Sequence, residues 1–214
     1  MNKLILEVNH FLKELPITWA VCGGFALDMF LEKDIRKHSD IDICVFDKDR
    51  ERICKYMLQR GWSIYEFRGQ GMVNPLDSVS PSNHDCNLMC IKGTCDFVKF
   101  FPCEDSKLLY HEFQHTGITE LNYLEFLFNS MNDNYFVFDK TNSITRELSK
   151  AILYHNGIPY LSPELALLFK SNKSENIEYQ LDFKETFPNM SDEQKQWFLK
   201  NLDVLYPNGH IWKI

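Results

Sequence analysis

The chain has no long hydrophobic run and no excess of positive charge. No stretch approaches the roughly 20 apolar residues that a membrane-spanning helix needs. The first residues, MNKLILEVNHFLKEL, have no uninterrupted hydrophobic core and no small-residue cleavage site, so we expect no secretion signal. Acidic residues outnumber basic ones by 30 to 23, and the net charge is −7. This balance argues against a nucleic-acid partner, which normally meets a basic face, and is compatible with a small cationic acceptor.

Paired cysteine motifs are also missing. The seven cysteines are irregularly spaced and include no C-x-x-C pair, which fits a reducing cytoplasm better than a disulfide scaffold. One histidine and four cysteines could suggest a zinc site: His84, Cys86, Cys90, Cys95 and Cys103. Several of these cysteines lie in apolar, strand-like runs, so we interpret them as buried thiols that pack as small hydrophobic groups.

Length and hydrophobic periodicity predict two parts. The 214 residues are enough for one sizeable domain or two small ones with a buried core. Strand-like and helical segments are mixed up to Thr145, and helical patterns alone follow it. We therefore expect an α/β (α+β) fold, with a mixed-sheet domain over residues 1–145 and a helical domain over residues 146–214.

Turn and capping residues divide the chain into finer elements. The predicted elements are a helix near the N-terminus, a helix over Asp47–Gly61, a strand over Trp62–Phe67, a loop over Gly69–His84, paired strands over Asn87–Ile91 and Asp96–Phe101, a hairpin of Leu121–Phe128 with Tyr135–Phe138, and helices from Pro163, Leu181 and Asp192.

One stretch, Val21–Val45, carries the residues with the clearest chemistry, and a short apolar run leads into it. An apolar run over Ile17–Val21 predicts a buried strand, Gly23-Gly24 interrupts it, and Phe25–Leu31 has helical spacing. A glycine pair that opens a helix leaves backbone N–H donors free at the positive end of the helix dipole. Gly23 and Gly24 are therefore predicted to hold phosphate groups.

Basic and acidic residues follow that helix. Arg36 and His38 precede Asp40 and Asp42, which point to one face of a predicted strand because side chains alternate along a strand. Two carboxylates on one face repel each other unless a cation lies between them, and hard oxygen ligands of this kind suit Mg²⁺ with substrate phosphates. The order of glycines, helix, basic residues and D-x-D predicts metal-dependent nucleotide chemistry.

The stretch GGFALDMFLEKDIRKHSDIDI resembles the polymerase-β-like nucleotidyltransferase superfamily, and within it the aminoglycoside 2''-adenylyltransferase family. The family signature reads roughly G-G-[WF]-A-x-D followed by R-x-H-x-D-x-D. The runs IPYLSPELALLFK and DF…WFLKNL also resemble that family's C-terminal half. Where the family typically has K-D-E-x-D-F, this chain has Glu178-Tyr179-Gln180-Leu181-Asp182-Phe183, which keeps the D-F and loses the lysine.

The resemblance implies a third acid on a later strand, which completes the metal site and accepts the proton of an attacking hydroxyl. Asp96, in Cys-Asp-Phe, and Glu125, in Leu-Glu-Phe, both fit this position. We favour Glu125, because an ionised group in so apolar a run is costly without a cation or partner. In the alternative reading neither acid is catalytic and each pairs with a lysine.

Four other residues have two readings each. Arg36 contacts phosphate as a planar fork, or it is a cation placed against the helix dipole. His38 contacts substrate, or it positions the strand by hydrogen bonding. Asp28 orients Arg36, or it is only a surface acid. Lys170 reaches the phosphates, or, as we favour, it is solvated.

The resemblance implies transfer of a nucleoside monophosphate from an NTP, with ATP favoured, to a hydroxyl of a small molecule. The acceptor would be a cationic antibiotic of the aminoglycoside type. Mg²⁺ would be held by Asp40, Asp42 and Glu125, while Gly23, Gly24 and Arg36 contact phosphate. Two alternatives stay open: adenylylation of another protein, as in toxin–antitoxin pairs, and a nucleotide-binding module without catalysis.

Overall fold

The chain forms two compact units in the computed structural model, which describes residues 2–77, 86–93, 95–104, 106–114 and 117–213. Unit 1 comprises Ala20–Lys37 and Asn132–Ile214, and unit 2 comprises Asn2–Trp19 and His38–Met131. Each unit combines segments that are distant in the sequence, so these units do not coincide with the predicted division into residues 1–145 and 146–214.

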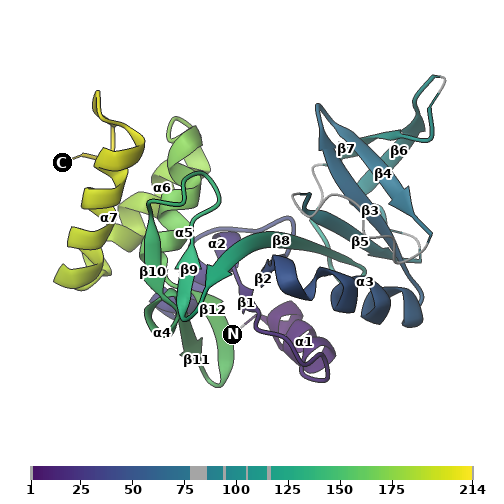
Figure 1. Ribbon diagram of the computed structural model, residues 1–214, viewed down its shortest axis with the longest axis horizontal. Helices are drawn as coiled ribbons and strands as arrows, with labels where there is room; N and C mark the ends of the chain where they lie inside the picture. The colour runs from purple at the N-terminus through teal and green to yellow at the C-terminus, as the bar shows by residue number, and fades with distance from the viewer. Residues whose placement is uncertain (1, 78–85, 94, 105, 115–116, 214) are drawn as a thin grey trace. The chain divides into compact units, whose positions relative to one another are not determined.

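Unit 2 is a mixed sheet with helices packed on it. Its elements are α1 (Lys3–Leu12), β2 (Asp42–Phe46), a 3-10 helix (Asp47–Asp49), α3 (Arg50–Gln59), β3 (Trp62–Gly69), β4 (Met72–Leu76), β5 (Leu88–Lys92), β6 (Val98–Pro102), β7 (Leu109–Phe113) and β8 (Tyr123–Asn132). The strands lie in the order β2-β8-β5-β3-β4-β7-β6 (Figure 1). β2 is parallel to β8, and the other neighbours are antiparallel.

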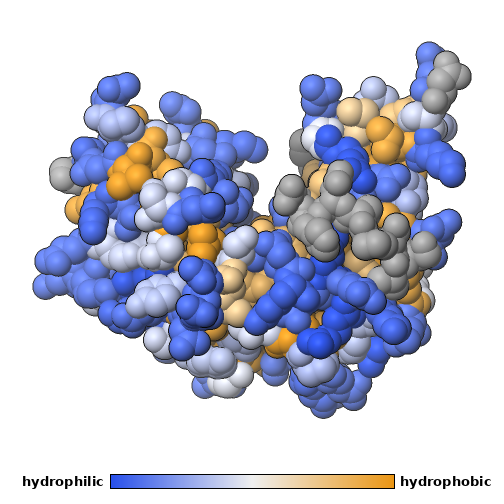
Figure 2. Space-filling model, in the orientation of Figure 1, coloured by the Kyte–Doolittle hydropathy of each residue, from blue (hydrophilic) through white to orange (hydrophobic). Residues whose placement is uncertain are grey.

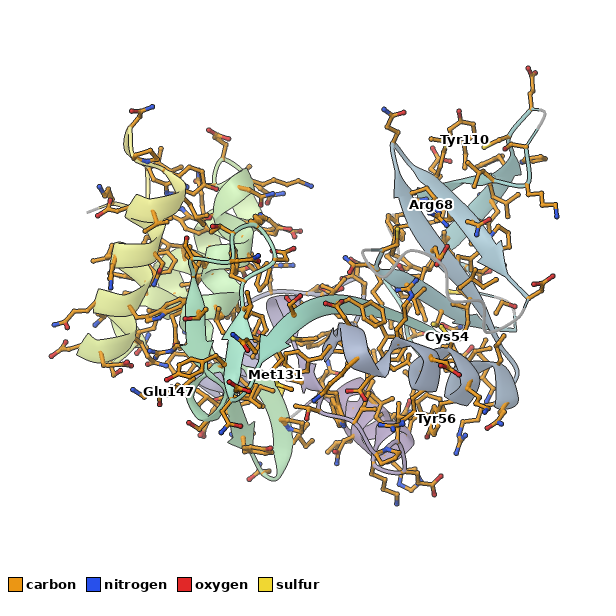
Figure 3. The ribbon with its side chains drawn as sticks, in the orientation of Figure 1. Cys54, Tyr56, Arg68, Tyr110, Met131 and Glu147 are labelled. Atoms are coloured by element: carbon orange, nitrogen blue, oxygen red, sulfur yellow. The ribbon has the colours of Figure 1, made fainter. Side chains whose placement is uncertain are left out.

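The two faces of this sheet bury different side chains. α3 packs against β3 and buries Cys54 and Met57, and Tyr56 of the same helix (Figure 3) contacts Phe11 of α1 with a centroid distance of 5.4 Å. Because side chains alternate along a strand, Met89 points away from its buried neighbour Cys90. Met89 belongs to a cluster of buried side chains with Val73, Ile91, Phe97, Val98 and Tyr123. This cluster provides the apolar support for the strand that carries Glu125.

Unit 1 contains several short strands and most of the described helices. Its elements are β1 (Ala20–Val21), α2 (Gly23–Leu31), β9 (Tyr135–Val137), β10 (Thr145–Glu147), α4 (Leu148–Ala151), β11 (Ile152–His155), β12 (Ile158–Leu161), α5 (Pro163–Lys170), a 3-10 helix (Ser171–Lys173), α6 (Ile177–Thr186), a 3-10 helix (Phe187–Asn189) and α7 (Asp192–Leu205). β12 is antiparallel to β11 and parallel to β1, and β9 pairs with β10. The mixed-sheet α/β class predicted from the sequence is confirmed.

The expectation that strands stop at Thr145 is wrong. β11 and β12 follow it and form a hairpin around Asn156-Gly157, where φ is 50° and 80°. Positive φ at both central residues is what a type I′ hairpin turn requires. The wholly helical part begins only at Pro163, where a helix was predicted to start. The predicted cap of the last helix, Ser191, is confirmed and forms a capping box with Gln194.

Two further predictions in unit 2 are wrong. Part of the loop predicted over Gly69–His84 is β4, which pairs with β3 across a turn where Gly69 and Gly71 have positive φ; residues 78–85 of that loop lie outside the described residues. The segments Asn87–Ile91 and Asp96–Phe101 lie in β5 and β6, which do not pair with each other. β5 lies between β3 and β8, and β6 pairs with β7.

The surfaces of both units carry some hydrophobic side chains, which Figure 2 shows in orange over the helices of unit 1 and over the strands of unit 2. The large exposed ones include Phe101 on β6, Ile177 on α6 and Val204 on α7. No helix in the described part of the chain is long and apolar enough to cross a membrane.

Candidate functional site

Three carboxylates of unit 2 come together at the start of β2. Asp42 is the first residue of β2, and its Cα partner on the parallel strand β8 is Glu125. Asp40 lies two residues earlier, and the Glu125 backbone N–H donates to the Ile41 carbonyl oxygen at 3.0 Å. One carboxylate oxygen from each of the three acids lies within 4.8 Å of the others. The acid favoured from the sequence therefore faces the D-x-D pair.

A close approach of two backbones supports the D-x-D segment. The Ile118 N–H donates to the Ser39 carbonyl oxygen at 3.0 Å. A Cβ atom on Gly117 would lie 2.8 Å from the Ser39 Cα, which is closer than real Cβ atoms come to a backbone atom. Gly117 is therefore required for the chain to pass beside the residue that precedes Asp40.

The protein environment of Glu125 opposes its negative charge. Burial raises the pKa of the Glu125 carboxyl well above its usual range, and the Asp42 carboxylate raises it further. The Tyr123 hydroxyl donates a hydrogen bond to Glu125 Oε1, and the two residues share a face because they are two positions apart on β8. Tyr123 is fully buried, and burial together with Glu125 raises the pKa of its hydroxyl, so it remains a donor.

These residues fit a divalent cation. The donor set is three carboxylates, which matches the hard oxygen ligands of Mg²⁺, and a cation between them would relieve the repulsion that raises the pKa of Glu125. Tyr123 orients the ligand Glu125 through a hydrogen bond, as second-layer partners of metal ligands do. Among the described residues this is the one group of three or more potential ligands with such spacing.

Asp96 and the cysteines lie elsewhere. Asp96 is exposed in the turn before β6 and does not belong to the carboxylate group. Four of the residues considered for zinc, Cys86, Cys90, Cys95 and Cys103, are free thiols that form no ligand cluster with other described residues; His84 lies outside the described residues. The preference for Glu125 over Asp96 thus has structural support, and the catalytic role of Glu125 stays a prediction.

The predicted phosphate cradle is the start of α2 in unit 1. α2 begins at Gly23, two residues earlier than the apolar periodicity indicated, and Gly23 has a φ of 65° that glycine adopts without strain. Both glycines are partly exposed. Phosphate binding by Gly23 and Gly24, and substrate contact by the half-buried His38, stay predictions.

Arg36 is held by carboxylates of α6. Its Nε and Nη2 donate to the two oxygens of Asp182 at 3.0 and 3.2 Å, and its Nη1 lies 3.0 Å from Glu178 Oε2. Asp28 contributes indirectly, since its Oδ1 accepts from the Ile35 N–H at 2.9 Å and so fixes the residue before Arg36. Asp28 is buried, so it is not the surface acid of the alternative reading.

Several residues around these sites were not predicted from the sequence. The solvated reading of Lys170 is wrong, because it is buried and its Nζ lies 3.0 Å from Asp182. The kept D-F dipeptide was the signal for Asp182, although nothing in it indicated Arg36 as the partner. For Tyr123 the signal was its position two residues before Glu125 on the predicted strand, which places both side chains on one face.

Part of the sequence matches a known family, and the fold is similar to that of a solved structure. Residues 4–68 match the sequence model of the aminoglycoside-2''-adenylyltransferase family. Among solved structures, the lincosamide antibiotic adenylyltransferase LnuA with lincomycin bound is 15% identical, with 86% of this chain and 94% of that chain covered and a TM-score of 0.53. ANT(2")-Ia in complex with adenylyl-2"-tobramycin is 12% identical, with 93% and 97% covered and a TM-score of 0.48. A search of curated protein sequences found no match.

The family match includes Gly23, Gly24, Arg36, Asp40 and Asp42, and ends before Glu125. It confirms the resemblance read from these residues. The likeness to the lincosamide enzyme shows that the two chains share a fold. The family match and the shared fold together support the assignment of this chain as a nucleotidyltransferase.

Proposed function

We propose that this protein transfers a nucleoside monophosphate, AMP from ATP, to a hydroxyl of a small-molecule antibiotic and releases pyrophosphate. The observation that carries the proposal is the group of Asp40, Asp42 and Glu125, whose oxygens lie within 4.8 Å of one another in a chain that matches an adenylyltransferase family over residues 4–68. This arrangement offers the charge that a metal–nucleotide complex requires.

Each residue has a role in the proposed reaction. Asp40 and Asp42 hold Mg²⁺, which when bound neutralises phosphate charge and orients the nucleotide. The backbone at Gly23-Gly24 and the Arg36 guanidinium contact phosphate oxygens. Glu125 takes the proton of the acceptor hydroxyl while the hydroxyl oxygen forms a bond to the α-phosphorus. The bond between the α-phosphorus and the oxygen that bridges to the β-phosphate breaks, and pyrophosphate leaves. Apart from that proton transfer, the protein acts by positioning and charge stabilisation.

The acceptor is proposed to be a hydroxyl-bearing antibiotic that carries positive charge. The net charge of −7 is compatible with such an acceptor. The matched family is named for aminoglycosides, and the structure that shares the fold has lincomycin bound. Both antibiotic classes contain amine and hydroxyl groups, so both belong in a first panel. Location in the cytoplasm, where ATP is abundant, is part of the proposal.

The experiment is a transfer assay. The protein is incubated with ATP and Mg²⁺ against aminoglycosides, lincosamides and a cell lysate, and products are analysed by mass spectrometry. A gain of one AMP on an antibiotic, absent with D42N, supports the proposal. AMP on a lysate protein supports protein adenylylation instead, and ATP binding without any product supports a module that has lost catalysis.

A further inference from the structure

Asp182 fixes the plane of the Arg36 guanidinium in unit 1. Arg36 Nε lies 3.0 Å from Asp182 Oδ1, and Nη2 lies 3.2 Å from Oδ2. This two-point contact between planar groups allows one orientation of the arginine, whereas a single contact would allow rotation. The Asp182 side chain is fully buried and only 15% of the Arg36 side chain is exposed, so the pair is shielded from water.

A second cation keeps Asp182 in place. Lys170 Nζ lies 3.0 Å from Asp182 Oδ2 and 4.2 Å from the centre of the Tyr179 ring. A buried carboxylate between two cations has no better arrangement available, because separating it from either one would leave an uncompensated charge. Arg36, Asp182 and Lys170 therefore form a rigid ionic cluster.

The remaining nitrogen of Arg36 has a different environment. Nη1 donates to the Lys37 carbonyl oxygen at 3.1 Å and lies 3.0 Å from Glu178 Oε2. The Glu178 side chain is 61% exposed and sits in the first turn of α6. An exposed ion pair of this kind is weak, since water solvates the carboxylate equally well when it rotates away. Nη1 is thus the one position on Arg36 whose charged partner exchanges readily.

We propose that Arg36 Nη1 contacts a phosphate of the nucleoside triphosphate, that Glu178 occupies this position until the nucleotide displaces it, and that Asp182 is the positioning residue. The inference rests on the proposed function, which supplies the nucleotide. Glu178 stands where the family pattern K-D-E-x-D-F has lysine. A carboxylate there repels phosphate as well as competing with it, so it lowers nucleotide affinity.

The test measures binding of ATP with Mg²⁺ to the full-length protein by titration calorimetry. Glu178→Gln removes the charge and should tighten binding by about two- to fivefold, the equivalent of an exposed ion pair. Glu175→Gln is the matched control, because Glu175 is also exposed just before α6 and should leave the affinity unchanged. In turnover assays E178Q should lower the KM for ATP and leave kcat unchanged.

A double-mutant cycle assigns the effect to Arg36. Arg36→Gln removes Nη1, so adding E178Q to R36Q should give no further tightening. Asp182→Asn should weaken ATP binding, because the Arg36 guanidinium is then no longer held in one orientation. Circular dichroism shows whether this variant folds. If it does not fold, E178Q and its control E175Q test the proposed contact of Arg36 with phosphate.

The outcomes separate two failures. ATP binding that E178Q does not change, or changes no more than E175Q, would overturn this inference and leave the proposed function standing. Tightening by E178Q that persists in the R36Q background would also overturn it. If the unmodified protein binds no nucleotide, the proposed function fails and this inference fails with it.

Discussion

Asp42 and Glu125 lie directly opposite each other on the parallel strands β2 and β8, although 82 other residues separate them in the chain. Parallel pairing in register places their side chains on the same face, two acids at the distance of neighbouring strands. Repulsion between them adds to the effect of burial in raising the pKa of Glu125. Two neighbouring carboxylates in this arrangement cost electrostatic free energy unless a cation binds between them.

Loss of either D-x-D carboxylate should abolish transfer. D40N and D42N keep the side-chain size and remove one charge, so nucleotidyl transfer with Mg²⁺ should fall by roughly 100-fold or more. Thermal unfolding should show that the fold is retained. Near-normal turnover in both variants would contradict the metal site.

Removal of the Glu125 carboxylate should have a comparably large effect on turnover. E125Q should reduce kcat by roughly 10²–10⁴-fold, the usual contribution of a general base, while ATP still binds. D96N is the matched control, because Asp96 is exposed and lies outside the carboxylate group. Equal loss in the two variants would argue against Glu125 as the proton acceptor.

The Tyr123 hydroxyl should contribute through Glu125. Y123F removes the hydrogen bond to Glu125 and should cost about 10–100-fold in Mg²⁺ affinity or activity, as for other partners of metal ligands. Y110F serves as control, since Tyr110 is exposed on β7 (Figure 3). A Y123F variant with unchanged metal affinity and turnover would show that the hydrogen bond does not orient the ligand.

Mg²⁺ binding should weaken as the pH falls. The raised pKa of Glu125 means that its carboxyl takes up a proton at a higher pH than an ordinary glutamate, near 4.3, would. Because a metal ligand must be deprotonated, protons compete with Mg²⁺ for Glu125 in the pH range where its carboxyl titrates. Mg²⁺ titrations at several pH values should show this dependence, and E125Q should weaken binding and reduce the dependence. A pH dependence that is the same in E125Q would assign it to other groups.

Gly117 should be sensitive to a single added methyl group. G117A places a Cβ within 2.8 Å of the Ser39 Cα, so the chain must shift beside Asp40. We expect a loss of stability of about 1–3 kcal/mol together with reduced transfer activity. Gly209→Ala is a useful contrast: nothing lies within 4 Å of its added Cβ, although its φ of 107° also strains an alanine. Full activity in G117A would show that the segment adapts freely.

Much of this structure can be predicted from the chemistry of residues that are close together in the sequence. The helix at Gly23-Gly24, the strand that begins at Asp42 and the capped helix at Ser191 depend on contacts between near neighbours, which periodicity and capping residues report directly; Asp40, predicted on the same strand as Asp42, lies just before it. The preference for Glu125 came from the cost of placing a charge in an apolar strand, and the structure brings that residue to the D-x-D pair.

Contacts between residues that are distant in the sequence could not be predicted from local patterns. β5 and β6 looked like a hairpin because they are adjacent in sequence, yet β5 pairs with β3 and β8, which no local signal encodes. The partnership of Arg36 with Asp182 joins residues 146 positions apart. The hairpin at Asn156-Gly157 is different, because its Asn-Gly turn signal is local and present in the sequence, next to residues with helical patterns.

The most direct test of the central claim is the mass of a lincosamide or aminoglycoside after incubation with the protein, ATP and Mg²⁺. We predict a product heavier by one AMP with the unmodified protein, and none with D42N or E125Q or when EDTA removes the metal. A product that forms equally well with D42N or in EDTA would contradict a metal-dependent transfer at Asp40, Asp42 and Glu125.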